Sequence, residues 1–397
     1  MRNAVLICVI ILLAIGCSTK KDAAVNRFYH KTTAKFNPLF NAEEALRYGL
    51  LDITLNHDDN YWLRLPVDPY VLPEAYAAEE VATNEFFDRV QDKAVLTVQK
   101  HSMLIKGEQR NNQIARAYLL LGKGRYYSGE YLQAIEAFTY LIKNMSGDDL
   151  AIVAELWRAK SYLALGQHDR AARELINIAQ SGLLNNNQYA ISQAALADAL
   201  LREEKDSLAT EFLTKAFAIE KSASKRGRYA YLLGQIYEDL NYADSAIVAY
   251  QHVLDLNRRL PRKLWIHARL AQLKNNKPKD EETLKAYKRL LRSDEDRRFR
   301  DKIHYFYGTY LLKGKDSINA ETELKASLQT KTNDKYLKSL IYEQLALNRL
   351  DQVSFVKAGA YLDSTLQNLT SETKRYRKVA RKRKKPVSYT HLRAHET

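Results

Sequence analysis

This 397-residue chain lacks the catalytic sequence motifs that were sought in it. The phosphate-loop motif G-x-x-x-x-G-K-[ST], the zinc-protease motif H-E-x-x-H and the hydrolase motif G-x-S-x-G do not occur. Five histidines in the centre of the chain do not have the spacing of metal ligands: His101, His168, His252, His267 and His304. We expect them on helix surfaces or at helix interfaces where their ring nitrogens have hydrogen-bond partners. We therefore expect no enzyme activity, no metal and no cofactor.

Two short motifs resemble ligand sites only in part. His57-Asp58-Asp59 has the residue types of a metal site, but the pattern favours a hydrated loop. Gly122-Lys123-Gly124 contains two glycines and a lysine, yet we interpret Gly122 as a packing residue within a helix rather than part of a phosphate loop. Neither motif predicts catalysis.

Cys17 is the residue for which the sequence predicts a chemical role. Arg2 precedes an apolar run of twelve residues, 4–15, which is too short to span a bilayer but fits a signal peptide. Small residues stand directly before Cys17, so we expect cleavage there and thioether linkage of its sulfur to diacylglycerol. A secretory signal with a chance cysteine is the alternative. No acidic run follows in 18–22, which favours the periplasmic face of the outer membrane.

The end of the chain has an unusual composition. Residues 374–385 contain nine basic side chains and no acidic one, although the formal net charge of the whole chain is +15. Such a run binds nucleic acid or anionic lipid in other proteins; here export argues against nucleic acid, and we interpret 371–386 as a basic linker to a missing C-terminal part. Residues 387–397 back-translate into a transposase-type sequencing adapter, so we expect them to be an artefact.

Composition favours an all-α protein. Hydrophobic residues make up 46% of the chain, which excludes global disorder, while 14 glycines and 7 prolines are too few for an all-β fold. Two cysteines exclude a disulfide framework, and Cys8 leaves with the signal peptide.

A repeat of about 37 residues organises the middle of the chain. One column holds a small residue in each repeat, and a second column four residues later holds an aromatic residue or leucine. The small column is Ala134, Ala171, Ala209, Ala246, Thr283, Ala320 and Ala358, and the large column is Phe138, Leu175, Leu213, Tyr250, Tyr287, Leu324 and Leu362. Together with Leu-Gly pairs such as Leu233-Gly234, this is the tetratricopeptide (TPR) pattern. We predict an all-α, TPR-like α-solenoid of about seven helix-turn-helix repeats whose concave surface binds protein segments.

Local signals agree with this register. Asp206-Ser207, Asp244-Ser245 and Asp316-Ser317 precede the second helix of their repeats, so we predict side-chain caps there, with serine modification as the alternative.

The segment before the repeats is predicted to be helical and extended. A helix with a capping box is expected from Asn41 to beyond Ile53, with Glu44 as the second box residue. Residues 61–73 contain Pro66, Pro69 and Pro73 between aromatic residues, which predicts an extended strap that lies across the first repeats or docks on a partner. Residues 77–105 are expected to be helical, with one apolar face formed by Phe87, Val90, Ala94 and Val98.

These observations divide the chain into five parts: a signal peptide (1–16), a lipidated N-terminal segment with the strap (17–105), the repeat array (106–370), the basic linker (371–386) and the adapter (387–397).

Two stretches have a more specific pattern than the repeats. The first comprises 17–22 (CSTKKD), 26–30 (NRFYH) and 33–41 (TAKFNPLFN); the second comprises 101–107 (HSMLIKG) and 118–123 (YLLLGK). Together they resemble the PorW/SprE lipoproteins of the type IX secretion system of Bacteroidota, over most of 17–370. The members of that family are longer, which agrees with a truncated chain.

The resemblance implies a scaffold under the outer membrane that connects the PorK/PorN ring to the outer-membrane translocon and supports protein secretion and gliding motility. Its implied partners are these proteins and, through the lipid on Cys17, the membrane, but not nucleic acid. Two alternatives remain open: another envelope TPR lipoprotein that acts as an adaptor, and an enzyme whose catalytic domain lies in the missing part.

Overall fold

The computed structural model describes residues 18–70, 84–330 and 332–384. The chain forms two compact units, the first from Met1–Asn60 and Leu65–Lys225 and the second from Tyr61–Arg64 and Arg226–Thr397. Four residues of the N-terminal segment thus belong to the second unit. The signal peptide, Cys17, the end of the strap and 387–397 lie outside the described residues.

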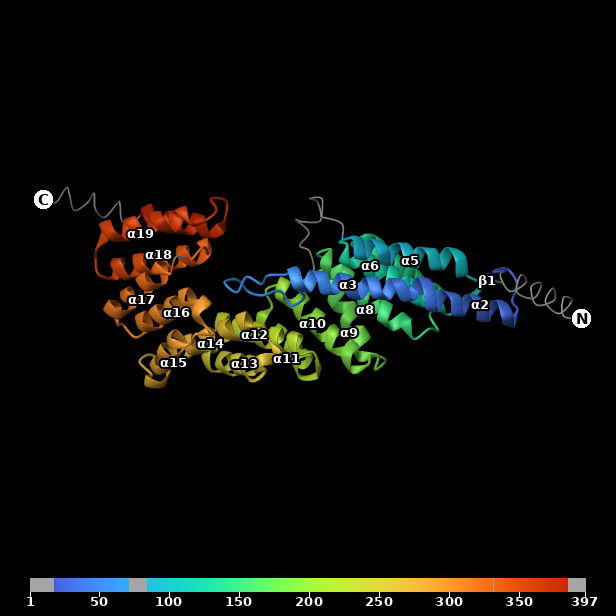
Figure 1. Ribbon diagram of the computed structural model, residues 1–397, viewed down its shortest axis with the longest axis horizontal. Helices are drawn as coiled ribbons and strands as arrows, with labels where there is room; N and C mark the ends of the chain where they lie inside the picture. Colours follow the sequence, from blue (N-terminus) through green and yellow to red (C-terminus); the bar gives the residue numbers. More distant parts are fainter. Residues whose placement is uncertain (1–17, 71–83, 331, 385–397) are drawn as a thin grey trace, which may run out of the picture. The chain divides into compact units, whose positions relative to one another are not determined.

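A nearly continuous helical stretch opens the first unit (Figure 1). It consists of α2 (Ala24–Ala34), the π-helical turn η1 (Lys35–Leu39) and α3 (Phe40–Asn56). Pro38 lies inside η1; because proline has no N–H to donate, the wider turn occurs where an α-helical hydrogen bond is lost. The helix α5 (Glu85–His101) follows, then a hairpin of β1 (Leu104–Ile105) and β2 (Glu108–Gln109) that pairs Leu104 with Gln109.

The capping box expected at Asn41 is absent. The helix α3 begins at Phe40 with no side-chain cap, and Glu44 pairs with Arg47 instead. The physical reason is that α2 and η1 already supply helical carbonyls to the N–H groups at this point, so no cap is required. The helix predicted in 77–105 corresponds to α5, with Phe87, Val90 and Ala94 buried and Val98 partly buried. Residues 77–83 lie outside the described residues, and the predicted helical end at 104–105 is wrong, because these residues pair as β1 in the hairpin.

Seven helix pairs follow in the described part of the chain. The first helices of the pairs are α6 (Gln113–Tyr127), α8 (Leu150–Ala164), α10 (Asn186–Arg202), α12 (Ala223–Asp239), α14 (Arg262–Asn275), α16 (Arg300–Lys313) and α18 (Lys335–Asp351). The second helices are α7 (Tyr131–Asn144), α9 (His168–Gln180), α11 (Asp206–Ile219), α13 (Ala243–Asp255), α15 (Glu281–Arg292), α17 (Ser317–Gln329) and α19 (Phe355–Gln367). The short 3-10 turns η2 (Asn257–Arg259) and η3 (Arg297–Phe299) precede α14 and α16.

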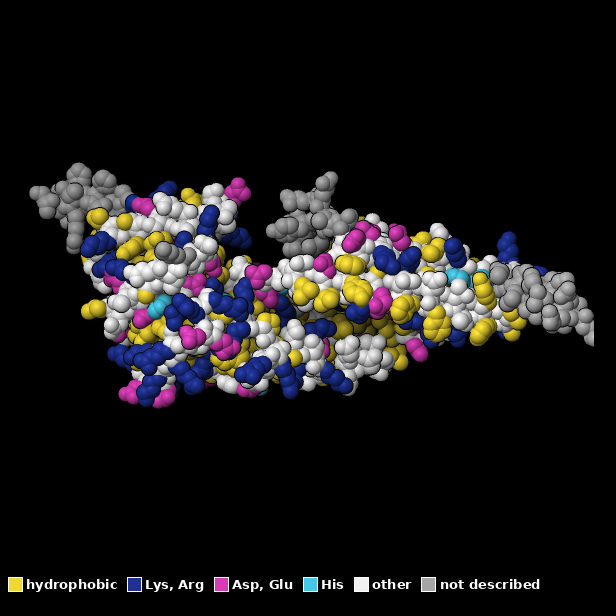
Figure 2. Space-filling view, in the orientation of Figure 1, with side chains coloured by type: hydrophobic (Ala, Val, Ile, Leu, Met, Phe, Trp, Pro, Cys, Tyr) yellow, Lys and Arg dark blue, Asp and Glu magenta, His cyan; other side chains and the backbone are white. Residues whose placement is uncertain are grey.

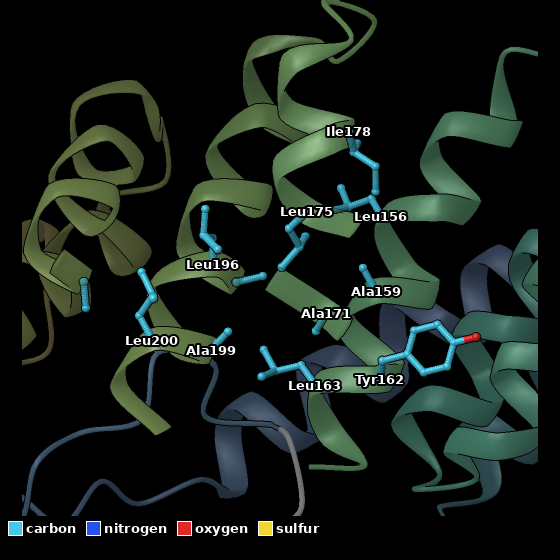
Figure 3. Packing of buried hydrophobic residues seen from close by; sticks show 12 residues of the cluster. Leu156, Ala159, Tyr162, Leu163, Ala171, Leu175, Ile178, Leu196, Ala199 and Leu200 are labelled. Carbon is cyan, nitrogen blue, oxygen red and sulfur yellow. The ribbon is translucent and has the colours of Figure 1, made fainter. Parts of the chain in front are cut away.

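The two predicted packing columns form the core of the repeats. All fourteen residues of the small and large columns are buried, and they lie on the second helix of each pair. Figure 3 shows one such layer, in which Ala171 and Leu175 of α9 lie between side chains of α8 and α10. The prediction of an all-α, TPR-like solenoid of seven repeats is therefore confirmed.

Glycine on the first helix permits close approach of the second. A Cβ atom added to Gly308 would lie 2.8 Å from Cγ of Leu324, closer than real Cβ contacts allow. Gly122 and Gly234 face Phe138 and Tyr250 in the same way. A methyl group at these positions would push the paired helices apart.

The turn between the two helices contains one residue of positive φ in every repeat. This residue adopts a left-handed conformation, with φ between 56° and 79°. The seven turn residues are Gly129, Gly166, Glu204, Asn241, Lys279, Lys315 and Val353. Only two are glycines, so five repeats accept the steric cost of a side chain in this conformation.

The predicted caps are confirmed at one of three sites. Asp316 accepts a hydrogen bond from the backbone N–H of Asn319 and caps α17. Asp206 and Asp244 lie inside the first turns of α11 and α13, whose cap residues Lys205 and Tyr242 make no side-chain cap. At these two positions the carboxylates instead stand where a helix dipole favours negative charge. Among the described helices, none is long and apolar enough to cross a membrane.

Candidate interaction surface

An extended segment of the N-terminal region packs against the first helices of the repeats. The segment comprises residues 57–70, which follow the end of α3 and contain no helix. Pro66 and Pro69 favour this extended backbone because they cannot continue a helical hydrogen-bond pattern. The predicted strap, 61–73, therefore exists over 61–70, and 71–73 lie outside the described residues.

Two aromatic residues dock the strap on the second unit. The ring of Tyr61 stacks on the imidazole of His267, with 4.4 Å between centroids and 13° between planes. The indole of Trp62 stacks on Phe306 at 5.9 Å, and its Nε1 donates a hydrogen bond to Asp334 Oδ2 at 2.8 Å. These contacts satisfy the polar atom of the indole while its rings are partly buried.

Polar contacts fix the backbone that follows. Gln235 Nε2 donates to the carbonyl oxygen of Leu63 at 2.8 Å, and Arg64 forms an ion pair with Asp239. A side-chain amide that donates to a backbone carbonyl can bind an extended segment whatever side chain the bound residue carries. Residues 61–64 are therefore held within the second unit by stacking, by backbone hydrogen bonding and by charge.

The first unit binds the next strap residues. Leu65 and Val67 are buried, and Asp68 Oδ2 pairs with Lys160 Nζ at 2.9 Å. The ammonium of Lys160 also lies 4.4 Å from the ring centroid of Trp157. This arrangement holds a carboxylate against a cation that is itself placed over an aromatic ring.

Burial shifts the titration of the groups around this ion pair. Burial raises the pKa of Asp68, but the charge of Lys160 and its hydrogen bond outweigh that effect and lower the pKa below its usual value. Burial, with the nearby charge of Lys160, lowers the pKa of Lys123 to about 8. The Asp68 carboxylate thus pairs with Lys160, whose own charge disfavours protonation of the neighbouring Lys123.

Two of the strap contacts come from one helix position that recurs in the repeats. The column follows directly after the small packing residue of the first helix in the first six pairs. Its members are Lys123, Lys160, Asp198, Gln235, Gln272 and Thr309, separated by 37 or 38 residues. Lys160 binds Asp68 in the first unit and Gln235 binds Leu63 in the second. Sequence reasoning missed this polar column, although a polar residue after the packing Gly or Ala of six successive repeats was a usable signal.

Of the other residues considered from the sequence, His267 belongs to this surface through its stacking on Tyr61, and Lys123 belongs to the polar column. His57 Nε2 pairs with Asp59 Oδ1 at 2.8 Å within its own loop, and His304 pairs with Glu323 at 2.6 Å. Gly122-Lys123-Gly124 lies within α6. Within the described ranges no group of three or more His, Cys, Asp and Glu side chains is placed to hold a metal. Cys17, the predicted lipid site, lies outside the described residues.

The basic run near the end of the described chain is helical over 374–384. Arg375 and Lys382 both pair with Glu343 of α18, and Arg383 pairs with Asp363 of α19. Val379 is buried against this last pair. Part of the segment interpreted as a linker therefore packs as a further helix, in which three of its cations pair with two carboxylates, one on α18 and one on α19.

Comparison with known proteins yields structural neighbours only. No family model and no curated protein matches the chain. A tetratricopeptide repeat protein from Parabacteroides merdae is 11% identical, with 70% of this chain and 100% of that chain covered and a TM-score of 0.44. The apo form of RapI is 12% identical, covers 68% and 99%, and has a TM-score of 0.42. The fold assignment rests on the packing of this chain's own helices.

Proposed function

We propose that this chain is a periplasm-facing, lipid-anchored scaffold of the type IX secretion system at the outer membrane. Its role is to connect the periplasmic PorK/PorN ring with outer-membrane translocon components and so to support protein secretion and, in hosts that glide, gliding motility. The proposal starts from the sequence resemblance of two stretches, 17–41 and 101–123, and from the predicted acylation of Cys17.

The observation that carries the proposal is that these two stretches pack together. His30 and His101, more than 70 residues apart in the chain, are both buried with their Nδ1 atoms 3.0 Å apart. Leu39 of the first stretch shares one hydrophobic cluster with Leu120 and Leu121 of the second. The resemblance therefore concerns one folded element rather than two unrelated matches, which supports its use as a guide to function.

The repeats support the scaffold part of the proposal. Stacked helix pairs offer an extended surface for protein segments, and this chain already binds its own strap with stacking, amide and ion-pair contacts. A role in binding proteins needs no reactive group, and we propose none.

A clean deletion in the native host tests the proposal. Mass spectrometry of the culture medium should show that proteins with type IX C-terminal signals disappear from the medium and accumulate in the periplasm. Restoration by the wild-type gene excludes polar effects on neighbouring genes. Unchanged secretion would refute the role and leave a different envelope adaptor as the better account.

The anchor is tested separately. Cys17→Ala should abolish acylation and remove the protein from outer-membrane fractions, whereas Cys8→Ala, within the predicted signal peptide, should leave its fractionation unchanged. Continued recovery of Cys17→Ala in the outer membrane would refute lipid attachment at this residue.

A further inference from the structure

The first helix of the described chain has its apolar face turned outward. The buried residues of α2 are Asn26, His30 and Ala34, which are polar or small. Its large hydrophobic residues are exposed instead, with Phe28 70% and Val25 62% accessible. A surface helix that packs only against the core of its own protein shows the opposite pattern, with large apolar residues buried and polar residues exposed.

The exposed face continues into η1 and α3. Phe36 is 67% exposed and Phe40 55%, and the two lie four residues apart on successive turns. Figure 2 shows hydrophobic side chains gathered along α3 and α2 on the side that faces the viewer. Eight of the twenty large hydrophobic side chains that are exposed in the described part of the chain lie in 25–55. We name Val25, Phe28, Phe36 and Phe40 the aromatic face.

Positive charge accompanies the aromatic face. Residues 18–40 contain five basic side chains, Lys20, Lys21, Arg27, Lys31 and Lys35, and one acidic side chain, Asp22. The ammonium of Lys35 lies 5.0 Å from the ring centroid of Phe36, so cation and ring occupy the same part of the surface. Exposed phenylalanines with flanking lysines match the interface of a bilayer that contains anionic lipid.

The chain length to Cys17 sets how far this face can lie from a membrane. Val25 is eight residues from Cys17, which spans at most about 28 Å when fully extended. An acylated Cys17 would therefore hold the aromatic face within reach of the headgroups at high effective concentration, so that even weak affinity leads to contact.

We propose that the aromatic face docks on the membrane surface, with its phenylalanines among the lipid headgroups and upper acyl chains and its lysines on anionic phospholipid. The argument from chain length rests on the proposed lipid attachment at Cys17. The exposure and charge of the aromatic face do not depend on that attachment. Docking would orient the N-terminal helices along the bilayer and fix the direction in which the repeats begin.

Binding to vesicles tests the proposal without the anchor. The chain from residue 17 onward with Cys17→Ser is mixed with vesicles of phosphatidylethanolamine and phosphatidylglycerol, and bound protein is measured by co-sedimentation. The triple variant Phe28→Ser, Phe36→Ser, Phe40→Ser should lower the partition coefficient about tenfold or more, because its exposed apolar area is lost. Lys31→Glu with Lys35→Glu, added salt, or neutral phosphatidylcholine vesicles should each weaken binding.

A matched control separates this face from general surface hydrophobicity. Leu183, Ile318 and Val356 are 70%, 81% and 77% exposed but lie elsewhere, so their replacement by Ser should leave vesicle binding unchanged. Both triple variants change exposed side chains and should keep the melting temperature of the parent. Absence of vesicle binding, or equal loss in both variants, would overturn the proposal. Because acylation and secretion are not involved, this result is independent of the tests of the proposed function.

Discussion

Removal of the Tyr61 ring should make His267 easier to protonate. Burial, reinforced by the nearby charges of Lys302 and Lys263, lowers the pKa of His267 to about 3. The ring of Tyr61 lies parallel to the imidazole at 4.4 Å and excludes water from one of its faces. Tyr61→Ala opens that face, so we expect the pKa of His267 to rise by one unit or more toward the ordinary value of about 6.5.

The sign and size of the pH effect on stability follow from this pKa. The folded state keeps His267 neutral down to about pH 3, while the unfolded chain protonates it near pH 6.5. The unfolded state thus binds more protons between these values, and stability is present above about pH 6.5 and is lost as the pH falls. Between pH 7 and pH 5 the loss from this residue is about 2 kcal/mol, at about 1.4 kcal/mol per pH unit.

Carbon-13-labelled histidine and NMR titration of the full chain measure the pKa directly, with His267→Gln to assign the resonance. Urea unfolding at pH 7 and pH 5 measures the linked stability, which His267→Gln should make less dependent on pH. His252→Gln is the control, because His252 lies on an exposed helix surface. Titration of His267 near pH 6 in the parent chain, or an unchanged pKa in Tyr61→Ala, would refute the reasoning.

Three further predictions concern the repeats and the strap. Ala246→Leu should destabilise the second unit by about 1–3 kcal/mol through overpacking, whereas Ala243→Leu on the exposed start of the same helix should change its melting temperature little. Val353→Gly should increase the free energy of unfolding by about 1 kcal/mol and so raise the melting temperature, because Val353 is exposed and has a φ of 56°. A lower melting temperature would contradict this account of the turns. Asp68→Ala should cost about 2 kcal/mol and accelerate limited proteolysis of the strap, since Lys160 loses its partner; equal effects of Lys215→Ala at an exposed ion pair would contradict it.

The repeat core was predictable because its signal is periodic. Ala246 and Tyr250 recur with equivalents at about 37 residues, and each occupies the same buried place in its helix pair. Local capping was less predictable, because a cap depends on where the chain becomes helical. Asn41 does not cap a helix because the chain is already helical before it, whereas Asp316 is the N-cap residue at the first turn of α17.

The strap contacts were beyond sequence reasoning for a different reason. The bond from Trp62 to Asp334 joins residues 272 positions apart, and nothing in the local sequence of either residue specifies the other. The polar column relates two of these contacts to the repeat, because Gln235 and Lys160 occupy equivalent helix positions and both contact the strap. A segment that follows one column need only match the repeat in spacing and charge. The same reasoning predicts that a partner segment which competes with 61–64 for the second unit would carry an aromatic pair.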